Sequence, residues 1–401
     1  MVCLNSILKI ITRKCRITVI IIILGIPVSI NSQIPEGQVS GPEKLWEEIS
    51  QYFSPPEKYQ NNYGDYRSPL KFYDGTAVKT PEDWILRRKE ILARWHEMMG
   101  EWPPFIETQD PEILNTTIKD GYLQHRIRFE WLPGQKTEGY LLIPHGSFNK
   151  PAVITVFYEP ETAIGESDRS YLDLSRQLTK KGFVTLSLGT DDSRAITGAH
   201  SLYFPDLSNS TIEPLSVMAY AAANAWHLLA ALPEVDPGRI GVMGHSYGGK
   251  WALFASCLFE KFACGVWSDP GIVFDESRPN VNYWEPWYLG YYPPPWEKTW
   301  RRSGDIEGAR GLYPKLLREG YDLHELHALM APRPFLVSAG SEDPPDRWIA
   351  LNHTIDVNSL LGYSNRVGMT NRLTHAQDRE SNEQILMFFD YFLKNKGIYL
   401  P

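Results

Sequence analysis

The sequence predicts an α/β protein with a mostly parallel central sheet covered by helices on both faces. From about residue 121 onward, short apolar runs alternate with segments of helical periodicity, which is the order expected of βαβ units. The runs 151–158 and 183–189 are hydrophobic along most of their length, as in strands buried on both faces. With 401 residues, 43% of them hydrophobic, the chain is long enough to build a large core.

The first 32 residues are expected to form a signal peptide. Basic residues between Lys9 and Arg16 precede the apolar run 17–30, and the small residue Ser32 follows at a plausible cleavage site. The run is shorter than the roughly 20 residues that a membrane-spanning helix needs, so cleavage is favoured over a retained anchor. The mature protein is therefore expected to be secreted or periplasmic, without a stable membrane span.

Charge and cysteine content narrow the classes of partner and site. The net charge is −8, which argues against nucleic acid and anionic membranes, because both are bound through basic patches. Two of the four cysteines lie in the leader, and Cys257 and Cys264 remain. A disulfide between these two is possible after export, but two buried thiols are the favoured interpretation. No Cys/His cluster has the spacing of a zinc site, and neither a metal nor an organic cofactor is expected.

Residues 33–120 are expected to form a helical extension that packs on the main domain, because alone they contain little core. A helix is predicted over 81–99, with Thr80 as its N-cap and Gly100 at its end. Residues 121–401 form the predicted catalytic domain. It opens with a hairpin that turns at Pro133-Gly134. Further strands are predicted at 151–158, 183–189, 240–244, 265–269, 334–340 and 365–370, and helices at 170–182, 214–232, 248–259 and 380–395.

Ser246 lies where a predicted strand meets a predicted helix, within the pattern Gly-His-Ser-Tyr-Gly of residues 244–248. A serine held on a very sharp strand-to-helix turn needs neighbours without side chains two positions away on either side. Catalytic residues of open α/β sheets collect at this edge of the sheet. Ser246 is therefore the candidate nucleophile, although Gly-x-Ser-x-Gly alone could be an ordinary glycine-rich loop.

A serine nucleophile needs a histidine base and a carboxylate that orients the histidine. His375 follows the last predicted strand and comes after the serine in the chain, whereas other histidines lie in predicted helices or at variable loop positions. Asp343 follows the strand 334–340 and is the preferred acid. Asp269, at the end of the preceding strand, is its rival. The oxyanion is expected to be bound by the backbone amide of Tyr247 and by that of Tyr158 or Glu159.

The motifs GHSYGG, SAGSED and LTH, in this order, resemble the α/β-hydrolase superfamily from about Tyr122 to the C-terminus. Within it the chain is similar to bacterial secreted carbohydrate esterases, including acetyl xylan esterases and glucuronoyl esterases. The segment SPLKFYDGTAVKTPEDWILRRKEIL is similar to the leader of bacterial glucuronoyl esterases. The resemblance implies that Lys250 contacts the sugar, although a solvated helix lysine is the alternative. Glucuronoyl esterases carry arginine directly after the nucleophile where this chain has Tyr247, which leaves acetyl esters open.

An aromatic-rich insertion is expected over about 272–320. Insertions at this point of the superfamily often form a substrate wall, and aromatic faces stack on sugar rings. One or two of its aromatic residues are expected at the site and the others in packing. Trp284 and Trp287 are the candidates for sugar stacking, and Glu285 is a candidate for a polar contact with a sugar hydroxyl.

These features predict a secreted serine esterase that hydrolyses acetyl or related esters on a carbohydrate by a Ser-His-Asp acyl-enzyme mechanism. A serine peptidase of the same fold and a catalytically silent carbohydrate-binding protein are the alternatives.

Overall fold

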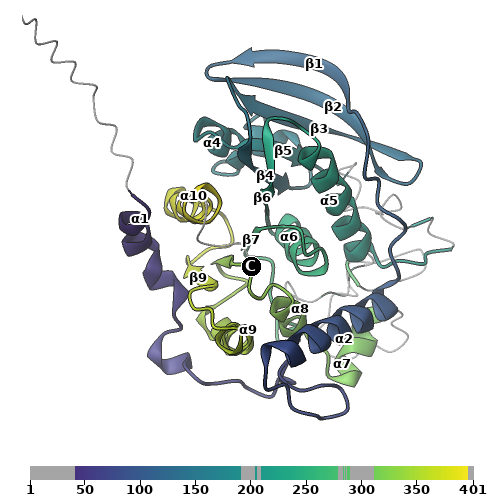
Figure 1. The fold of residues 1–401 in the computed structure, drawn as a ribbon, viewed down its shortest axis with the longest axis vertical. Coiled ribbons are helices and arrows are strands. Elements are labelled where there is room, and N and C mark those ends of the chain that lie inside the picture. Colours follow the sequence, from purple (N-terminus) through teal and green to yellow (C-terminus); the bar gives the residue numbers. More distant parts are fainter. Residues whose placement is uncertain are drawn as a thin grey trace, which may run out of the picture. The chain divides into compact units, whose positions relative to one another are not determined.

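One nine-stranded sheet runs through the part of the chain that the computed structural model describes, which is residues 41–190, 204–205, 209–278, 283, 285, 287–289 and 311–395. The predicted leader lies outside these residues. The strand order is β1-β2-β3-β5-β4-β6-β7-β8-β9 (Figure 1). The strands are β1 Glu112–Lys119, β2 Tyr122–Leu132, β3 Gln135–Pro144, β4 Lys150–Val156, β5 Val184–Leu188, β6 Val235–His245, β7 Cys264–Ser268, β8 Phe335–Ala339 and β9 Val367–Asn371.

The predicted α/β class with a mostly parallel sheet is confirmed. Strands β5, β4, β6, β7, β8 and β9 are parallel neighbours, while β1, β2 and β3 form an antiparallel meander that joins β5. The predicted hairpin is also confirmed, since β2 pairs with β3 around Gly134, whose φ is 73°. Strand β1 was not predicted. It is an edge strand whose residues are mostly exposed, so it lacks the apolar pattern that marks the inner strands.

Helices cover both faces of the sheet, as predicted. Helices α1, α4 and α10 share one hydrophobic cluster with the sheet, and helices α2, α5, α6, α8 and α9 share the other (Figure 1). The helices are α1 Pro42–Ile49, α2 Pro81–Met99, α3 Glu161–Ile164, α4 Leu174–Lys180, α5 Pro214–Ala230, α6 Tyr247–Leu258, α7 Leu312–Glu319, α8 His324–Ala328, α9 Trp348–Leu360 and α10 Arg379–Lys394, with short 3-10 helices η1 Ser50–Phe53, η2 Glu57–Tyr59 and η6 Pro345–Arg347.

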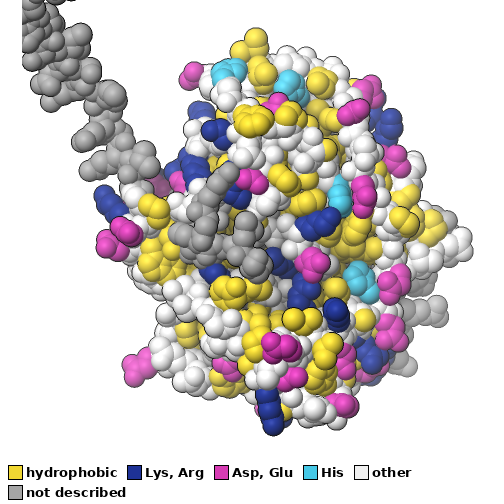
Figure 2. Space-filling view, in the orientation of Figure 1, with side chains coloured by type: hydrophobic (Ala, Val, Ile, Leu, Met, Phe, Trp, Pro, Cys, Tyr) yellow, Lys and Arg dark blue, Asp and Glu magenta, His cyan; other side chains and the backbone are white. Residues whose placement is uncertain are grey.

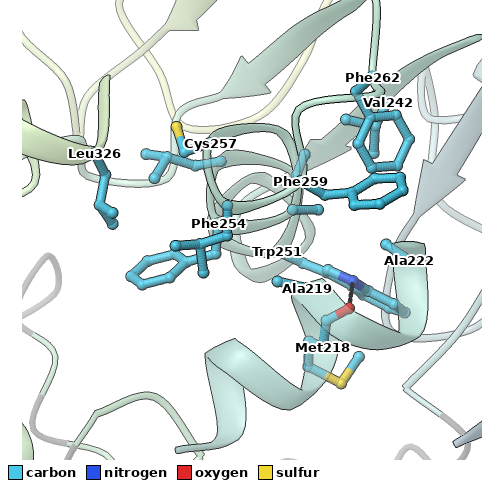
Figure 3. Close-up of a cluster of buried hydrophobic side chains, with 14 of the residues drawn as sticks. Met218, Ala219, Ala222, Val242, Trp251, Phe254, Cys257, Phe259, Phe262 and Leu326 are labelled. Atoms are coloured by element: carbon cyan, nitrogen blue, oxygen red, sulfur yellow. Dashed lines mark hydrogen bonds between the residues drawn. The ribbon is translucent and has the colours of Figure 1, made fainter. Parts of the chain in front are cut away.

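The central helix α6 is buried along its whole length, which fixes the position of its first residues. Figure 3 shows Trp251 and Phe254 of α6 among side chains from the sheet and from α5. The indole nitrogen of Trp251 donates a hydrogen bond to the carbonyl oxygen of Met218 at 2.5 Å, so the large ring is satisfied inside the core. Alanines such as Ala219 and Ala222 allow α5 to approach α6 closely. The loop that precedes α6 is therefore held on a rigid element.

The two free cysteines of the described chain, Cys257 and Cys264, are both buried thiols, as the favoured interpretation predicted.

No helix among the described residues combines the length and apolar character needed to cross a bilayer. On the face shown in Figure 2, acidic and basic side chains are interspersed. Exposed ion pairs of this kind, such as Arg379–Glu383 at 2.8 Å, each contribute little to stability.

The segment before the sheet packs on both faces of the main core. Helix α2 begins with a capping box, in which Thr80 Oγ1 accepts from the amide of Asp83 and the Asp83 carboxylate accepts from the amide of Thr80. Its side chains Trp84 and Trp95 are buried, whereas Ile85 is 54% exposed. This pattern follows from the helical period, because Ile85 is turned away from the core.

Two buried histidines attach the loop after η2 to the core. His324 Nε2 lies 2.6 Å from the carbonyl oxygen of Arg67, and His353 Nε2 lies 3.0 Å from that of Tyr63. In each of the two neutral rings, the Nε2–H group donates the bond. Burial, followed by the nearby His353, lowers the pKa of His324 to about 3. Neutral His324 thus fits its site, and the protonated form does not.

This site predicts a loss of stability in acid. The unfolded chain binds a proton at His324 near pH 6.5, whereas the folded chain resists protonation until about pH 3, so stability is complete above pH 6.5 and falls below it. Between about pH 7 and pH 5, His324 alone should lower the free energy of unfolding by about 2 kcal/mol. In urea titrations at the two pH values, His324→Gln should show a drop smaller than wild type by that amount. An equal drop in both proteins would contradict the prediction.

Candidate active site

Ser246 lies on a strained turn between β6 and α6. Its backbone has φ 58° and ψ −118°, a conformation that residues with side chains rarely adopt, and its amide donates to the carbonyl oxygen of Ser268 at 2.8 Å. Strain of this kind persists only where the surroundings enforce it, and it is typical of functional positions. The turn places Ser246, half-buried, at the C-terminal edge of the sheet.

The glycines around Ser246 have the steric role that the sequence predicted. A Cβ atom on Gly244 would lie 2.1 Å from the carbonyl oxygen of Gly248, and one on Gly248 would lie 2.0 Å from that of Val156. Both distances are far inside van der Waals contact. The absence of side chains therefore lets β6, α6 and the end of β4 meet at one point, next to Ser246.

His375 is bound to Asp269. Its Nδ1 lies 2.7 Å from Asp269 Oδ2, so the ring donates from Nδ1 and leaves Nε2 as the acceptor. The ring also lies beside that of His245, with centroids 4.7 Å apart, which brings it next to the residue preceding Ser246. Ser246, Asp269 and His375 thus come from three loops that follow β6, β7 and β9 at one sheet edge.

The buried carboxylate of Asp269 is bound by backbone amides of the turn after β8. Its Oδ1 accepts from the amides of Gly340 at 2.7 Å, Asp343 at 2.9 Å and Glu342 at 3.1 Å. The backbone of Asp269 has φ 49°, a second strained position at a strand end. A Cβ on Gly340 would lie 2.6 Å from Asp269 Oδ2, so the carboxylate needs glycine at this point.

The prediction that Asp343 contacts His375 is wrong. The Asp343 side chain instead accepts from the amides of Gly271 at 2.8 Å and Ile272 at 2.7 Å. The turn after β8 therefore donates its backbone amides to the carboxylate beside His375. The Asp343 carboxylate of that turn binds the loop after β7 instead. The rival residue Asp269 occupies the position predicted for Asp343.

The two neighbouring carboxyl groups differ in their pKa values. Burial opposes ionisation of Asp269, but the hydrogen bond from His375 and the charge of Arg372 outweigh it, and the pKa is lowered. Burial, and then the negative charge of Asp269, raises the pKa of Asp343 to about 6. Ionised Asp269 is thus suited to stabilise a protonated His375.

Arg372 holds the loop that carries His375, a contact that the sequence did not predict. One of its terminal nitrogens donates to the carbonyl oxygen of His375 and another to that of Ser338, each at 2.7 Å. Ser268 Oγ also links β6 to this loop, because it lies 3.1 Å from His245 Nδ1 and 3.0 Å from Gln377 Nε2. Burial, and then the neighbouring His375, lowers the pKa of His245 to about 3, so this ring remains neutral.

The candidate oxyanion donors come from the start of α6 and from the segment after β4. Tyr247 is the first residue of α6, where backbone amides have no partner within the helix. Tyr158 and Glu159 follow β4, whose last residue contacts the start of α6. The rings of Tyr158 and Tyr247 stack with centroids 5.4 Å apart. The two segments predicted to bind the oxyanion are therefore in direct contact.

Lys250 is buried beneath the segment after β7. Its side chain is 4% exposed, its Nζ donates to the carbonyl oxygen of Pro270, and it lies 3.9 Å from the ring centre of Tyr283. Burial lowers the pKa of Lys250 to about 8, while the charges of Glu285 and Asp343 act in the opposite direction. The alternative of a solvated surface lysine is therefore wrong.

The aromatic insertion is described only in part, and Trp284 lies outside the described residues. Trp287 is 5% exposed, and its carbonyl oxygen accepts from the Tyr247 hydroxyl at 3.3 Å. Glu285 is 2% exposed and raises the pKa of Lys250. Within the part of the insertion that is placed, the backbone of Trp287 is thus hydrogen-bonded to the residue that follows Ser246.

The described residues contain no group of three or more His, Cys, Asp or Glu side chains arranged to hold a metal ion.

The chain is similar to known enzymes. Residues 165–389 match the model of the alpha/beta hydrolase family. A 4-O-methyl-glucuronoyl methylesterase of Schizophyllum commune is 24% identical over 290 residues, which cover 68% of this chain and 67% of that protein. A protein of the same name from Phanerochaete carnosa is 20% identical over 375 residues, covering 86% and 84%.

Solved structures show the same fold. A glucuronoyl esterase from Solibacter usitatus superposes with a TM-score of 0.62 at 17% identity, covering 84% of this chain and 99% of that one. The predicted α/β-hydrolase fold and the resemblance to carbohydrate esterases are therefore confirmed.

Proposed function

Because the chain belongs to the alpha/beta hydrolase family, we propose that it is a serine esterase that cleaves carboxylic esters on a carbohydrate, with uronate esters as the preferred class. The hydrogen bond from His375 to Asp269, at the sheet edge that carries the strained Ser246, is the observation on which the proposal rests. The two curated relatives that match most of the chain, both methylesterases of a glucuronoyl group, support the choice of substrate.

In this mechanism the Ser246 hydroxyl attacks the ester carbonyl while His375 Nε2 takes its proton. The oxyanion is bound by the amide of Tyr247 and by that of Tyr158 or Glu159. His375 then gives the proton to the departing alcohol, leaving an acyl group on Ser246. Water, deprotonated by His375, attacks the acyl carbon. His375 then returns the proton to Ser246 Oγ as the acid is released. Asp269 keeps Nδ1 protonated throughout and stabilises the imidazolium.

Acetyl esters of carbohydrates are the second candidate. Tyr247 occupies the position that is arginine in the glucuronoyl esterases that the sequence resembles, and its ring is committed to stacking with Tyr158. A site without that arginine has one cation fewer beside the acyl group.

The leader 1–32 supports export of the enzyme, which suits a polymeric substrate outside the cell.

Lys250 is proposed to contact the sugar of the substrate. An ammonium group has three donors, and the structure assigns one of them to Pro270. Its place one helical turn after Ser246 supports this role. Trp284, Trp287 and Glu285 remain candidates for the sugar-binding wall, and a peptidase or silent binding function remains the alternative to be tested.

The first prediction concerns Ser246. A fluorophosphonate probe should label the wild-type protein, and Ser246→Ala should abolish labelling and lower kcat on the methyl ester of glucuronate by on the order of 10⁴ or more. The wild-type protein should also be assayed with acetylated xylan and with an aminoacyl-naphthylamide, because the class of compound that it cleaves identifies the substrate. Persistent labelling of the variant would overturn the nucleophile, and activity on the amide alone would make the protein a peptidase.

The second prediction separates the two carboxylates. Asp269→Asn should lower kcat by about 10⁴, because the amide leaves His375 in the wrong tautomer. Asp343→Asn should cost far less, since the Asp343 side chain accepts from the amides of Gly271 and Ile272 and lies 3.8 Å from Arg347 Nε, whereas His375 binds Asp269. Both replacements preserve shape, so each serves as the other's control in steady-state assays with p-nitrophenyl acetate. The larger loss in Asp343→Asn would reassign the acid.

The third prediction concerns Lys250. Lys250→Met should reduce kcat/KM for a carbohydrate ester by about ten- to a hundredfold, the effect of losing one charged hydrogen bond. A small ester such as p-nitrophenyl acetate does not reach the sugar position and should be spared. Equal losses on both substrates would instead mean that Lys250 acts through the Pro270 segment.

A further inference from the structure

A cavity of about 430 Å³ adjoins the candidate active site on the side of the β-meander. Its walls come from β2, β3 and the segment after β4, and Tyr158 is shared with the candidate oxyanion loop. The Tyr158 ring stacks on that of Tyr247, the residue after Ser246. The volume is within the range of sites that hold small molecules, so a ligand there would lie beside the reacting ester.

The wall formed by β2 and β3 presents fixed donors. Arg126 and Arg128 lie on the same face of β2 and share one carboxylate, that of Glu138 on β3, at 2.6 Å and 2.7 Å. Their side chains remain 52% and 40% exposed. Arg128 also donates to Glu112 at 3.3 Å, and the guanidinium hydrogens that neither glutamate accepts are exposed to a ligand. The paired arrangement holds both guanidinium groups in place before anything binds, which reduces the entropy that binding costs.

The wall formed by the segment after β4 presents acceptors. Glu159 and Glu161 line it, and Glu161 is oriented by the hydroxyl of Tyr140, which donates to it at 3.0 Å. Arg169 lies 3.9 Å from Glu159 and 5.7 Å from the ring centre of Tyr158. The cavity therefore combines carboxylate acceptors, guanidinium donors and one aromatic ring.

Charge balance indicates the class of ligand. Arg126, Arg128 and Lys136 are matched by Glu138, Glu159 and Glu161, so the lining has no excess of either sign. An anion would meet the carboxylates, and a cation would meet the guanidinium groups. A neutral ligand rich in hydroxyl groups can donate to one wall and accept from the other. Sugar rings have this character, and their flat faces stack on aromatic rings.

We propose that this cavity is a second subsite, which binds a neutral sugar unit of the chain that carries the ester. The inference rests on the proposed carbohydrate esterase function and deepens it, because it makes the enzyme selective for esters on an oligosaccharide over the same ester on a single sugar.

The test compares two substrates that share one acyl group, the methyl ester of glucuronate alone and the same ester linked to a neutral xylo-oligosaccharide. The double variant Arg126→Ala/Arg128→Ala should lose about tenfold or more in kcat/KM on the linked ester and change less than about twofold on the single sugar. Arg379→Ala is the matched control, because it removes an exposed arginine ion pair outside the cavity. An equal effect on both substrates, or none on the linked ester, would overturn the subsite.

A binding measurement separates failure of the subsite from failure of the proposed function. Isothermal titration of xylotriose and cellotriose into Ser246→Ala protein requires no turnover, and the arginine double variant in that background should bind at least tenfold more weakly. Circular dichroism spectra should show that the variant is folded. If neither trisaccharide binds, or if an oligogalacturonate binds in their place, the proposal is overturned even when the esterase activity is confirmed.

Discussion

The arrangement of the site depends on one buried charge, the carboxylate of Asp269. A buried anion is stable only when its hydrogen-bonding capacity is filled, and here the turn after β8 and the ring of His375 fill it. The exchange is reciprocal, since the Asp343 side chain of that turn binds the amides that follow Asp269. Each loop thus satisfies the charge of the other. The ends of β7 and β8 are fixed together, and the position of His375 follows from theirs.

The strands and helices were predictable where burial imposes a pattern. The inner strands are apolar on both faces, and the start of α2 combines a capping residue with an acidic third position. The exposed edge strand β1 has no such pattern and was missed. The serine turn could be predicted because its steric requirement is local, and Gly244 and Gly248 are visible in the sequence.

The acid could not be chosen from the sequence, because Asp269 and Asp343 both follow parallel strands at the same edge. Which carboxylate turns toward the histidine depends on side-chain direction, a property of the folded loops. One signal was present, since Gly340 leaves the space that the Asp269 carboxylate occupies. The depth of Lys250 was equally hidden, because the rings of Tyr283 and Tyr288 that cover it come from a distant insertion.

The contact between the first and last described helices has a consequence for the order of folding. The ring of Trp46 in α1 packs on Tyr391 of α10 at 5.0 Å, and Phe53 packs on Phe392 at 5.5 Å. These partners are separated by almost the whole chain, so the contact forms only after α10 has been synthesised. Until then Trp46 can pack on nearby Phe53, with ring centroids 5.3 Å apart, but neither ring can pack on α10. The face that α1 and η1 present to α10 therefore stays uncovered by α10 while the residues between these elements are being synthesised.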